Sequence, residues 1–190
     1  MAARIVLAVL LLAAGIGASS AQTPRPLTPQ DAVLAYEAAQ VSRSAIRDQL
    51  DLCAADADKL EQVFSRLRPE AGSEAGDWRE WGELYAQIGR ELLGCLRAYA
   101  KQRSLHLRDV ALMRERLPLM KQPKRLTLSP KQVAKINAYS AGLERELAGY
   151  DRRAMAIANG AENSSAKVAD LLRAAGASGV DLPTGFAADL

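Results

Sequence analysis

The spacing of large apolar side chains between residues 78 and 99 constrains the fold more than any other feature of the sequence. Seven of them follow one another at alternating steps of three and four residues: Trp78, Trp81, Tyr85, Ile88, Leu92, Cys95 and Tyr99. This period places them on one face of a helix and is typical of a seam between packed helices. The chain also contains 36 alanines but only 4 threonines, which favours helices over strands. We therefore expect an all-α fold.

Start and stop signals divide the chain into long helical segments. Thr28 and Ser129 each begin a capping pattern with proline at the first helical position, and Asp77 with Glu80 forms a third capping box. Prolines and glycines after each segment predict its end. The predicted helices cover residues 29–68, 77–117, 130–159 and, as a short fourth element, 164–175. These lengths indicate an up-down-up bundle in which a helical hairpin packs against the third helix.

The first segment leaves two points open. Asp58 with Glu61 is a second capping pattern, so residues 29–68 are either one helix or two. In the first half of the segment, we expect the inward face at positions that repeat at helical spacing: Leu34, Ala38, Val41 and Ala45.

The two cysteines indicate how the hairpin is aligned. If residues 29–68 and 77–117 fold back on each other about the loop near Ser73, position i faces position 148 minus i. Cys53 then faces Cys95, and further apolar pairs meet along the hairpin: Leu60 with Ile88, Phe64 with Leu84, and Leu67 with Trp81. We therefore predict one disulfide between the first two helices, which closes a long loop and stabilises the fold. A redox-active pair is not indicated, since the C-x-x-C spacing is absent.

Residues 1–21 have the pattern of a cleavable secretory signal. Arg4 precedes a continuous apolar run from Ile5 to Ala14, and small residues lead up to Ala21. This pattern predicts a periplasmic or secreted protein cleaved near Ala21, the alternative being an uncleaved membrane anchor. We expect residues 22–176 to form one helical bundle domain. Residues 177–190, rich in glycine and proline, are expected to be a loosely ordered tail.

Charge is divided unevenly along the chain. Residues 29–96 carry 7 basic and 13 acidic side chains, whereas residues 97–125 carry 9 basic and 2 acidic ones. The candidate partner-binding residues lie in this basic block: Arg108, Arg114, Arg116, Lys121, Lys124 and Arg125. They suit an acidic protein face or an anionic membrane surface. Alternatively, the block is a solvated face whose cations pair with Asp48 and Asp51 across the hairpin. We expect no nucleic-acid partner, because the sequence contains no recognition motif.

Two glycine pairs are spaced one heptad apart. Gly82 and Gly89 fall in the second predicted helix, and Gly142 and Gly149 fall in the third. Because glycine destabilises a helix interior, each pair indicates that something approaches closely. The approaching group is either a neighbouring helix of the bundle or a partner that docks in a shallow groove.

The sequence contains no pattern of catalytic, cofactor-binding or metal-binding residues. The single histidine, His106, has no evident catalytic partner and is expected at the surface. The acids Glu80, Glu83 and Glu91 lie along one helix and are expected to be solvated, whereas Trp78 and Trp81 are expected to seal the end of the bundle. We therefore expect no cofactor and no metal, and we favour a role other than catalysis, with a small enzyme as an open alternative.

Residues Leu128 to Gln132 are similar to a motif of known chaperones. The segment L-S-P-K-Q, followed by V-A-K-I, resembles the L-T-x-x-Q motif of the Spy and CpxP type periplasmic chaperones, from which it departs at Ser129. The similarity covers about nine residues. It implies a small exported helical protein with chaperone-like behaviour.

Together these features predict an exported helical module that binds a protein partner, such as an envelope assembly subunit, an adaptor or a chaperone-like protein. Two alternatives stay open. One is a small exported all-helical enzyme, and the other is a peripheral binder of anionic membrane surfaces.

Overall fold

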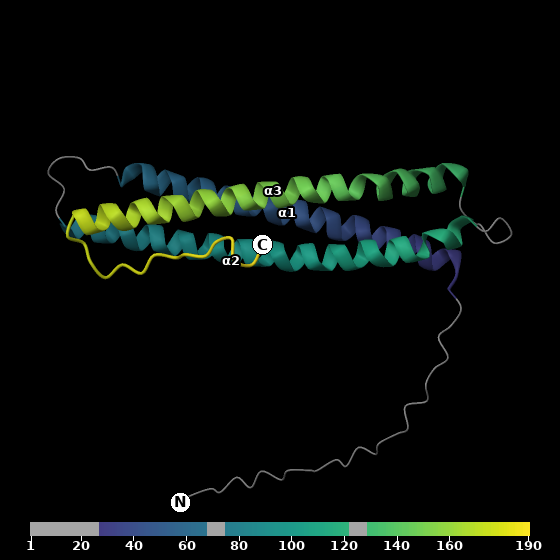
Figure 1. Ribbon diagram of the computed structural model, residues 1–190, viewed down its shortest axis with the longest axis horizontal. Helices are drawn as coiled ribbons and strands as arrows, with labels where there is room; N and C mark the ends of the chain where they lie inside the picture. Colours follow the sequence, from purple (N-terminus) through teal and green to yellow (C-terminus); the bar gives the residue numbers. More distant parts are fainter. Residues whose placement is uncertain (1–26, 68–74, 122–128) are drawn as a thin grey trace, which may run out of the picture.

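The computed structural model describes residues 27–67, 75–121 and 129–190. These ranges contain three long helices and one short 3-10 helix: α1 (Pro29–Arg66), α2 (Ala75–Arg116), η1 (Leu117–Lys121) and α3 (Pro130–Ala174). The long helices lie side by side, with α1 and α3 running in one direction and α2 in the other (Figure 1). The predicted all-α, up-down-up bundle is confirmed. Within the described residues, no helix combines the length and apolar character needed to span a membrane.

Two of the three predicted capping boxes start helices. At the start of α1, the backbone N–H of Thr28 donates to Oδ2 of Asp31 at 2.7 Å, and at the start of α3 the backbone N–H of Ser129 donates to Oε1 of Gln132 at 2.8 Å. These bonds satisfy backbone groups that have no partner inside the helix. The second helix differs from the prediction because it begins at Ala75, which places Asp77 inside the first turn. A carboxylate there still stabilises the positive end of the helix dipole.

The first helix is continuous. It passes Asp58 without a break, which decides between the one-helix and two-helix alternatives for residues 29–68. At the far end of α2, the α-helix stops at Arg116, and Pro118 lies in the 3-10 helix η1. Proline disfavours α-helical geometry in the residue before it, so this end follows from the sequence.

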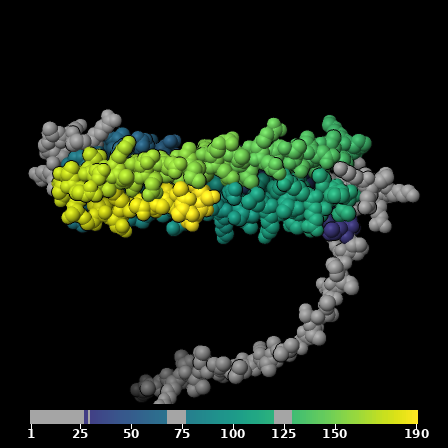
Figure 2. Space-filling model, in the orientation of Figure 1, coloured from purple at the N-terminus to yellow at the C-terminus, as the bar shows by residue number. Residues whose placement is uncertain are grey.

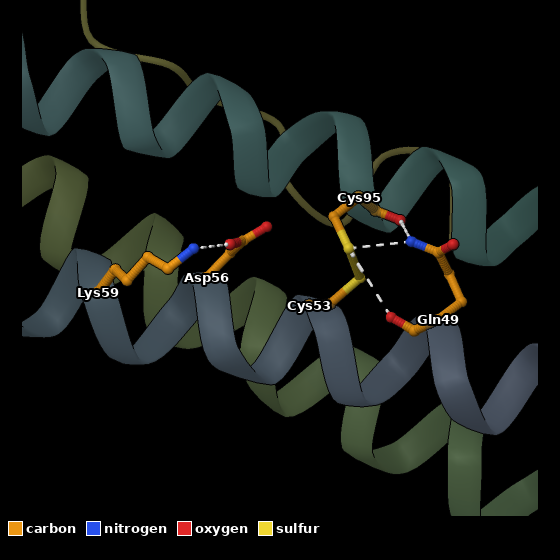
Figure 3. The surroundings of a disulfide bond; sticks show 5 residues. All are labelled: Gln49, Cys53, Asp56, Lys59 and Cys95. Carbon is orange, nitrogen blue, oxygen red and sulfur yellow. Dashed lines mark hydrogen bonds and ion pairs between the residues drawn. A yellow bond between two sulfur atoms is a disulfide. The ribbon is translucent and has the colours of Figure 1, made fainter.

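A disulfide joins α1 to α2 near the middle of the bundle. The Cα atoms of Cys53 and Cys95 are 5.5 Å apart (Figure 3). Gln49, one turn before Cys53, donates from its side-chain amide to the carbonyl oxygen and the sulfur of Cys95, at 3.5 Å and 3.1 Å. The predicted bridge is confirmed, and with it the hairpin alignment in which facing positions add up to 148.

The expected apolar pairs of the hairpin follow this alignment in most places. On α1, Leu60 and Leu67 are buried in the larger cluster of apolar residues, and Phe64 packs against it while partly exposed. The residues expected opposite them on α2 are less buried. Trp81 and Ile88 are partly buried there, but Leu84 is exposed. The seam on α2 therefore passes beside Leu84 rather than through it.

The buried apolar residues form two clusters. The larger cluster surrounds the disulfide and extends toward the end of the bundle where α1 ends, and it includes Tyr85, Leu92 and Phe186. The smaller cluster lies at the opposite end, where α1 and α3 begin. It consists of Ala32, Ala35, Tyr36, Ala39, Val110, Met113, Ile136 and Leu143. Three of its eight residues are alanine, all of them on α1.

The first half of α1 is rotated relative to the prediction. Leu34 and Val41 were expected to face inward, but they are 51% and 71% exposed. The buried positions are instead Ala32, Ala35, Tyr36 and Ala39. The prediction was wrong because both sets have helical spacing, and small alanines on the inner face allow α1 and its neighbours to approach closely.

The third helix is longer than predicted and absorbs the separate fourth helix. It continues through Gly160 to Ala174 instead of ending at residue 159. This extension buries Ala161, Val168 and Leu172 against the larger cluster. Burial of apolar side chains outweighs the roughly 1 kcal/mol by which an interior glycine destabilises a helix.

The C-terminal tail is also better packed than expected. After α3 the chain reverses at Gly176 and Gly179, whose φ angles are +70° and +88°, and it returns along α2 (Figure 1). Phe186 is only 1% exposed and belongs to the larger cluster. The hydroxyl of Ser165 on α3 donates to the carbonyl oxygen of Pro183 at 2.8 Å. The expectation of a loosely ordered tail is therefore corrected.

Candidate functional site

The predicted partner-binding residues are only partly within the described residues. Arg108, Arg114 and Arg116 lie on the last turns of α2, whereas Lys124, Arg125 and the side chain of Lys121 lie outside the described part. Arg108 is largely exposed, 3.7 Å from the carboxylate of Asp109. Arg114 donates to Glu144 of α3 at 2.9 Å. These two arginines are therefore on the surface, each beside a carboxylate.

Arg116 points in a different direction. It is half-buried, and its Nη1 donates to the carbonyl oxygen of Asp31 on α1 at 3.4 Å. Within the described residues its Nε has no hydrogen-bond partner. Arg116 therefore helps to join α1 to α2 rather than extending a basic surface.

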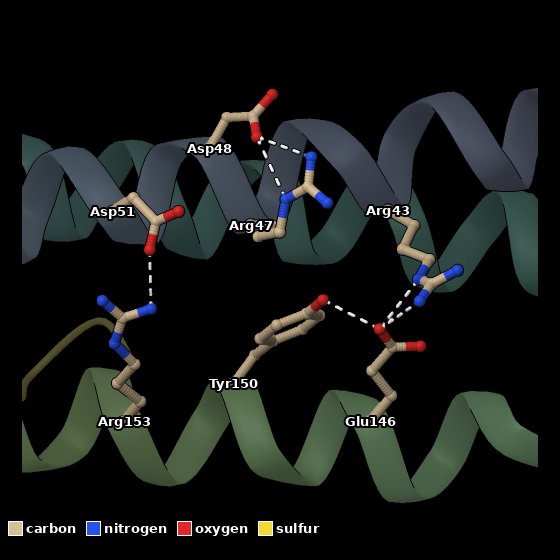
Figure 4. A network of polar contacts seen from close by, with 7 residues as sticks. All are labelled: Arg43, Arg47, Asp48, Asp51, Glu146, Tyr150 and Arg153. Atoms are coloured by element: carbon tan, nitrogen blue, oxygen red, sulfur yellow. Dashed lines mark hydrogen bonds and ion pairs between the residues drawn. The ribbon is translucent and has the colours of Figure 1, made fainter.

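The carboxylates that were considered as partners of the basic block pair elsewhere. Asp48 accepts from its neighbour Arg47 at 3.2 Å, and Asp51 accepts from Arg153 of α3 at 2.7 Å (Figure 4). The proposed pairing across the hairpin is therefore wrong. The sequence could not reveal this, because the pairing of Asp51 depends on where α3 lies.

A second polar group joins α1 to α3 close to these pairs. Arg43 donates to Oε1 of Glu146 at 2.8 Å and 2.5 Å, and the hydroxyl of Tyr150 donates to the same oxygen at 2.9 Å (Figure 4). The guanidinium carbon of Arg43 also lies 5.4 Å from the ring centre of Tyr139. A hollow beside this group is lined by Gln40, Arg43, Ser44, Arg47 and Tyr150. The nearby cations already have carboxylate partners, so this group is best explained as a link between helices.

Asp151 of α3 forms another link, this time to α2. It accepts a hydrogen bond from the Tyr99 hydroxyl at 2.9 Å and two from Arg103, at 2.6 Å and 2.8 Å. Burial by itself would raise the pKa of Asp151, but the hydrogen bonds from Arg103 and Tyr99 outweigh it and lower that pKa. Burial raises the pKa of the Tyr99 hydroxyl, and the hydrogen bond to Asp151 raises it further. Asp151 therefore stays ionised and holds both partners.

His106 is buried, which contradicts the expectation that it lies at the surface. It is 3% exposed, and its Nδ1 lies 2.9 Å from the hydroxyl oxygen of Ser42 on α1. Which of the two atoms donates depends on the tautomer of the ring. The Ser42 hydroxyl also lies 3.3 Å from the carbonyl oxygen of Ala39. Since Ser42 is buried as well, the pair joins two helices in the core and does not present a nucleophile in an open cleft.

The other side chains considered for chemistry are in structural positions. Glu80, Glu83 and Glu91 are exposed along α2, and Glu83 accepts from Arg79 at 2.9 Å. Trp78 is buried in the larger cluster, and Trp81 packs against it. Over the described ranges, there is no group of three side chains suited to hold a metal ion.

The two glycine pairs have different surroundings. A Cβ atom at Gly82 would lie 2.9 Å from both methyl carbons of Leu172, and one at Gly89 would lie 2.6 Å from Cγ of Pro183. The close approach predicted for this pair therefore exists, but it is made by α3 and by the chain's own tail. At Gly142 a Cβ atom would meet nothing within 4 Å, and at Gly149 only the end of a flexible arginine at 4.0 Å.

The surface feature that sequence reasoning missed is the outer face of α1. Leu34, Val41 and Leu52 are 51%, 71% and 60% exposed. At 3.6 residues per turn, Leu34 and Leu52 are about five full turns apart and Val41 is offset from them by about 20°. The three side chains therefore form one row along the outside of the helix. Leu34 and Val41 were expected in the core, and no prediction was made for Leu52.

Comparison with known proteins gives no match to a family model, to a curated protein or to a solved structure.

Proposed function

We propose that this chain is an exported helical module that binds a protein partner in the cell envelope through the outer face of α1. The observation that carries the proposal is the row formed by Leu34, Val41 and Leu52, which stays exposed on a helix that already buries its other face. Export is proposed from the signal-like pattern of residues 1–21, and a disulfide is compatible with an oxidising compartment.

The physical argument is that aligned apolar side chains differ from scattered ones. Single exposed leucines are normal on soluble proteins. A row on one face of a helix, here at steps of 7 and 11 residues, can instead pack against another helix, with each large side chain inserted between residues of the partner. Covering the row would remove apolar surface from water at about 25 cal/mol per Å². A partner that presents a helix or an apolar groove therefore fits this face.

Site-specific cross-linking tests the proposal. A photoreactive amino acid is placed at position 41 or 52 of the full chain, exported with its own signal in its native cell. The matched control carries it at Lys167, an exposed position on α3. We expect positions 41 and 52 to cross-link to the same protein, position 167 to give no such product, and Leu34→Ser to reduce the yield severalfold.

Three results would contradict the proposal. Equal products from position 167 would show that contact is unspecific, and no product from positions 41 and 52 would show that the row has no partner. A cross-linked product that contains only a second copy of the chain would show that the row mediates self-association and does not bind a different protein.

Binding to an anionic membrane surface through the basic block is the alternative. Arg114 already pairs with Glu144, and Arg116 is turned toward α1, which leaves fewer free cations on the described surface than the sequence suggested. Flotation with acidic vesicles at low salt separates the two functions. A chain that stays in the soluble fraction does not bind such surfaces.

A further inference from the structure

The side of the bundle where α2 meets α3 is covered by the tail over only part of its length. Figure 2 shows the tail following this side from the end of α3 and stopping near the middle of the bundle. Beyond that point lies a hollow of about 50 Å³ between α2 and α3. Its apolar lining is Leu107, Val110, Leu143 and Leu147.

Helix geometry shows that this hollow continues the groove occupied by the tail. In the covered part, the tail meets Gly89 of α2 and Glu162 of α3. Eighteen residues are about five full turns, so Leu107 has the same orientation on α2 as Gly89, and Glu144 has the same orientation on α3 as Glu162. Because α2 and α3 are antiparallel, both steps lead in the same direction along the bundle, by about 27 Å.

The tail shows which kind of segment this side of the bundle accepts. Its apolar anchors are Pro183 and Phe186, which are buried. Its backbone is held by Glu162, which accepts from the N–H groups of Gly185 and Phe186 at 2.9 Å and 3.1 Å. Near its end, Asp189 pairs with Arg97 of α2 at 2.9 Å. The tail is thus a non-helical segment, with turns over residues 186–189, that has apolar anchors and a carboxylate that meets a cation of α2.

The part of the groove that the tail leaves uncovered offers similar contacts. No described segment of the chain occupies it. Leu107 is 41% exposed at the position where the covered part has Gly89 beneath Pro183. Arg114 and Glu144 both line the hollow, and among the described residues Arg114 pairs with Glu144 in an exposed contact. Exposed ion pairs contribute little stability, so a carboxylate of a ligand can compete for this arginine.

We propose that the open part of this groove binds a non-helical segment of a partner chain that carries a short apolar anchor close to a carboxylate. The anchor enters the hollow beside Leu107 and Val110, and the carboxylate pairs with Arg114. The inference rests on the proposed function, protein binding, and adds a second surface with a defined ligand chemistry. Continuity with the tail groove points to this occupant, and its carboxylate would take the place of Glu144 beside Arg114.

A synthetic peptide with the sequence of residues 179–190 serves as the probe, because it has the chemistry that the covered part accepts. It is labelled with a fluorophore and titrated against the purified full chain, with binding followed by fluorescence anisotropy. We expect saturable binding that is weakened tenfold or more by Leu107→Asp and by Arg114→Glu. The matched control is Leu84→Asp, a similarly exposed leucine of α2 outside the groove, which should leave the affinity unchanged.

The binding position is then determined by cross-linking. A photoreactive phenylalanine replaces the phenylalanine of the peptide, and the attachment points are mapped by mass spectrometry. Attachment within residues 106–114 and 143–147 supports the proposal. Attachment within residues 82–97 would show that the peptide exchanges with the chain's own tail, and no saturable binding up to millimolar peptide would exclude the groove as a site; either result overturns the inference. Neither affects the cross-linking at positions 41 and 52, so the two proposals can fail separately.

Discussion

His106 lies on α2 and is enclosed by groups from all three helices. Ser42 contacts its Nδ1 from α1, and the charged groups that act on it are Asp109 on α2, Glu146 on α3 and Arg43 on α1. Burial lowers the pKa of the imidazole, the two carboxylates oppose this, and Arg43 adds to it. The ring is therefore held neutral in the core, where a charge would lack the solvation it has in water.

This environment predicts that the bundle loses stability in mild acid. The unfolded chain takes up a proton near the ordinary histidine pKa of about 6.5, whereas the folded chain does so only at lower pH. The contribution of His106 is therefore fully present above about pH 7 and is lost as the pH falls below about 6.5. We expect the free energy of unfolding, measured by urea denaturation, to decrease from pH 7.5 to 5.5. His106→Gln should show a smaller decrease; parallel curves for the two proteins would contradict the assignment.

At the scale of the helix, glycine has opposite effects on stability in α2 and in α3. Gly89 of α2 lies beneath Pro183 of the tail, whereas Gly142 of α3 has no neighbour within 4 Å of the place where a side chain would begin. A glycine that provides space for another segment stabilises the tertiary structure, although it weakens its own helix. A glycine with no neighbour only weakens the helix.

Substitution by alanine should separate these two roles. Gly142→Ala should raise the free energy of unfolding by about 0.4–1 kcal/mol, because alanine restricts the unfolded chain and meets nothing in the folded one. Gly89→Ala should lower it, because the new Cβ would lie 2.6 Å from the rigid ring of Pro183. Urea denaturation of both variants measures the difference. If both substitutions are stabilising, the tail does not occupy its groove as the structure shows.

At the scale of the whole molecule, the disulfide joins α1 and α2, which form the hairpin. The third helix and the tail pack against this hairpin. Cys53 and Cys95 are separated by 42 residues in sequence. A bridge over a loop of this length restricts the unfolded chain and stabilises the folded one by up to about 4 kcal/mol in the chain-entropy model. The larger cluster also contains apolar side chains that are not part of the bridge, such as Leu50 of α1, Tyr85 of α2 and Val168 of α3.

The double variant Cys53→Ser, Cys95→Ser should therefore remain helical but unfold more easily. We expect the free energy of unfolding to fall by about 2–4 kcal/mol, while the helical circular dichroism spectrum stays the same. A peptide map of the wild-type chain without reductant should contain the peptide that links Cys53 to Cys95. Two free thiols in the protein purified without reductant would contradict the bridge.

Much of the fold could be predicted, and the errors have identifiable causes. The capping residues at Thr28 and Ser129 and the pairing of Cys53 with Cys95 were correct, because each depends on neighbouring residues or on a single alignment. The inward face of α1 was wrong because two sets of apolar residues have the same period. His106 was placed at the surface because its partner, Ser42, lies 64 residues away in the sequence.

The sequence by itself determined that this chain forms long helices, where most of them begin and how the hairpin is aligned. Those properties follow from local periodicity, capping and the geometry of one covalent bridge. Only the tertiary structure decided which stripe of α1 is buried, that His106 is enclosed and that the tail occupies part of the groove between α2 and α3. These outcomes depend on contacts between segments that are far apart in the chain, and local patterns do not specify such contacts.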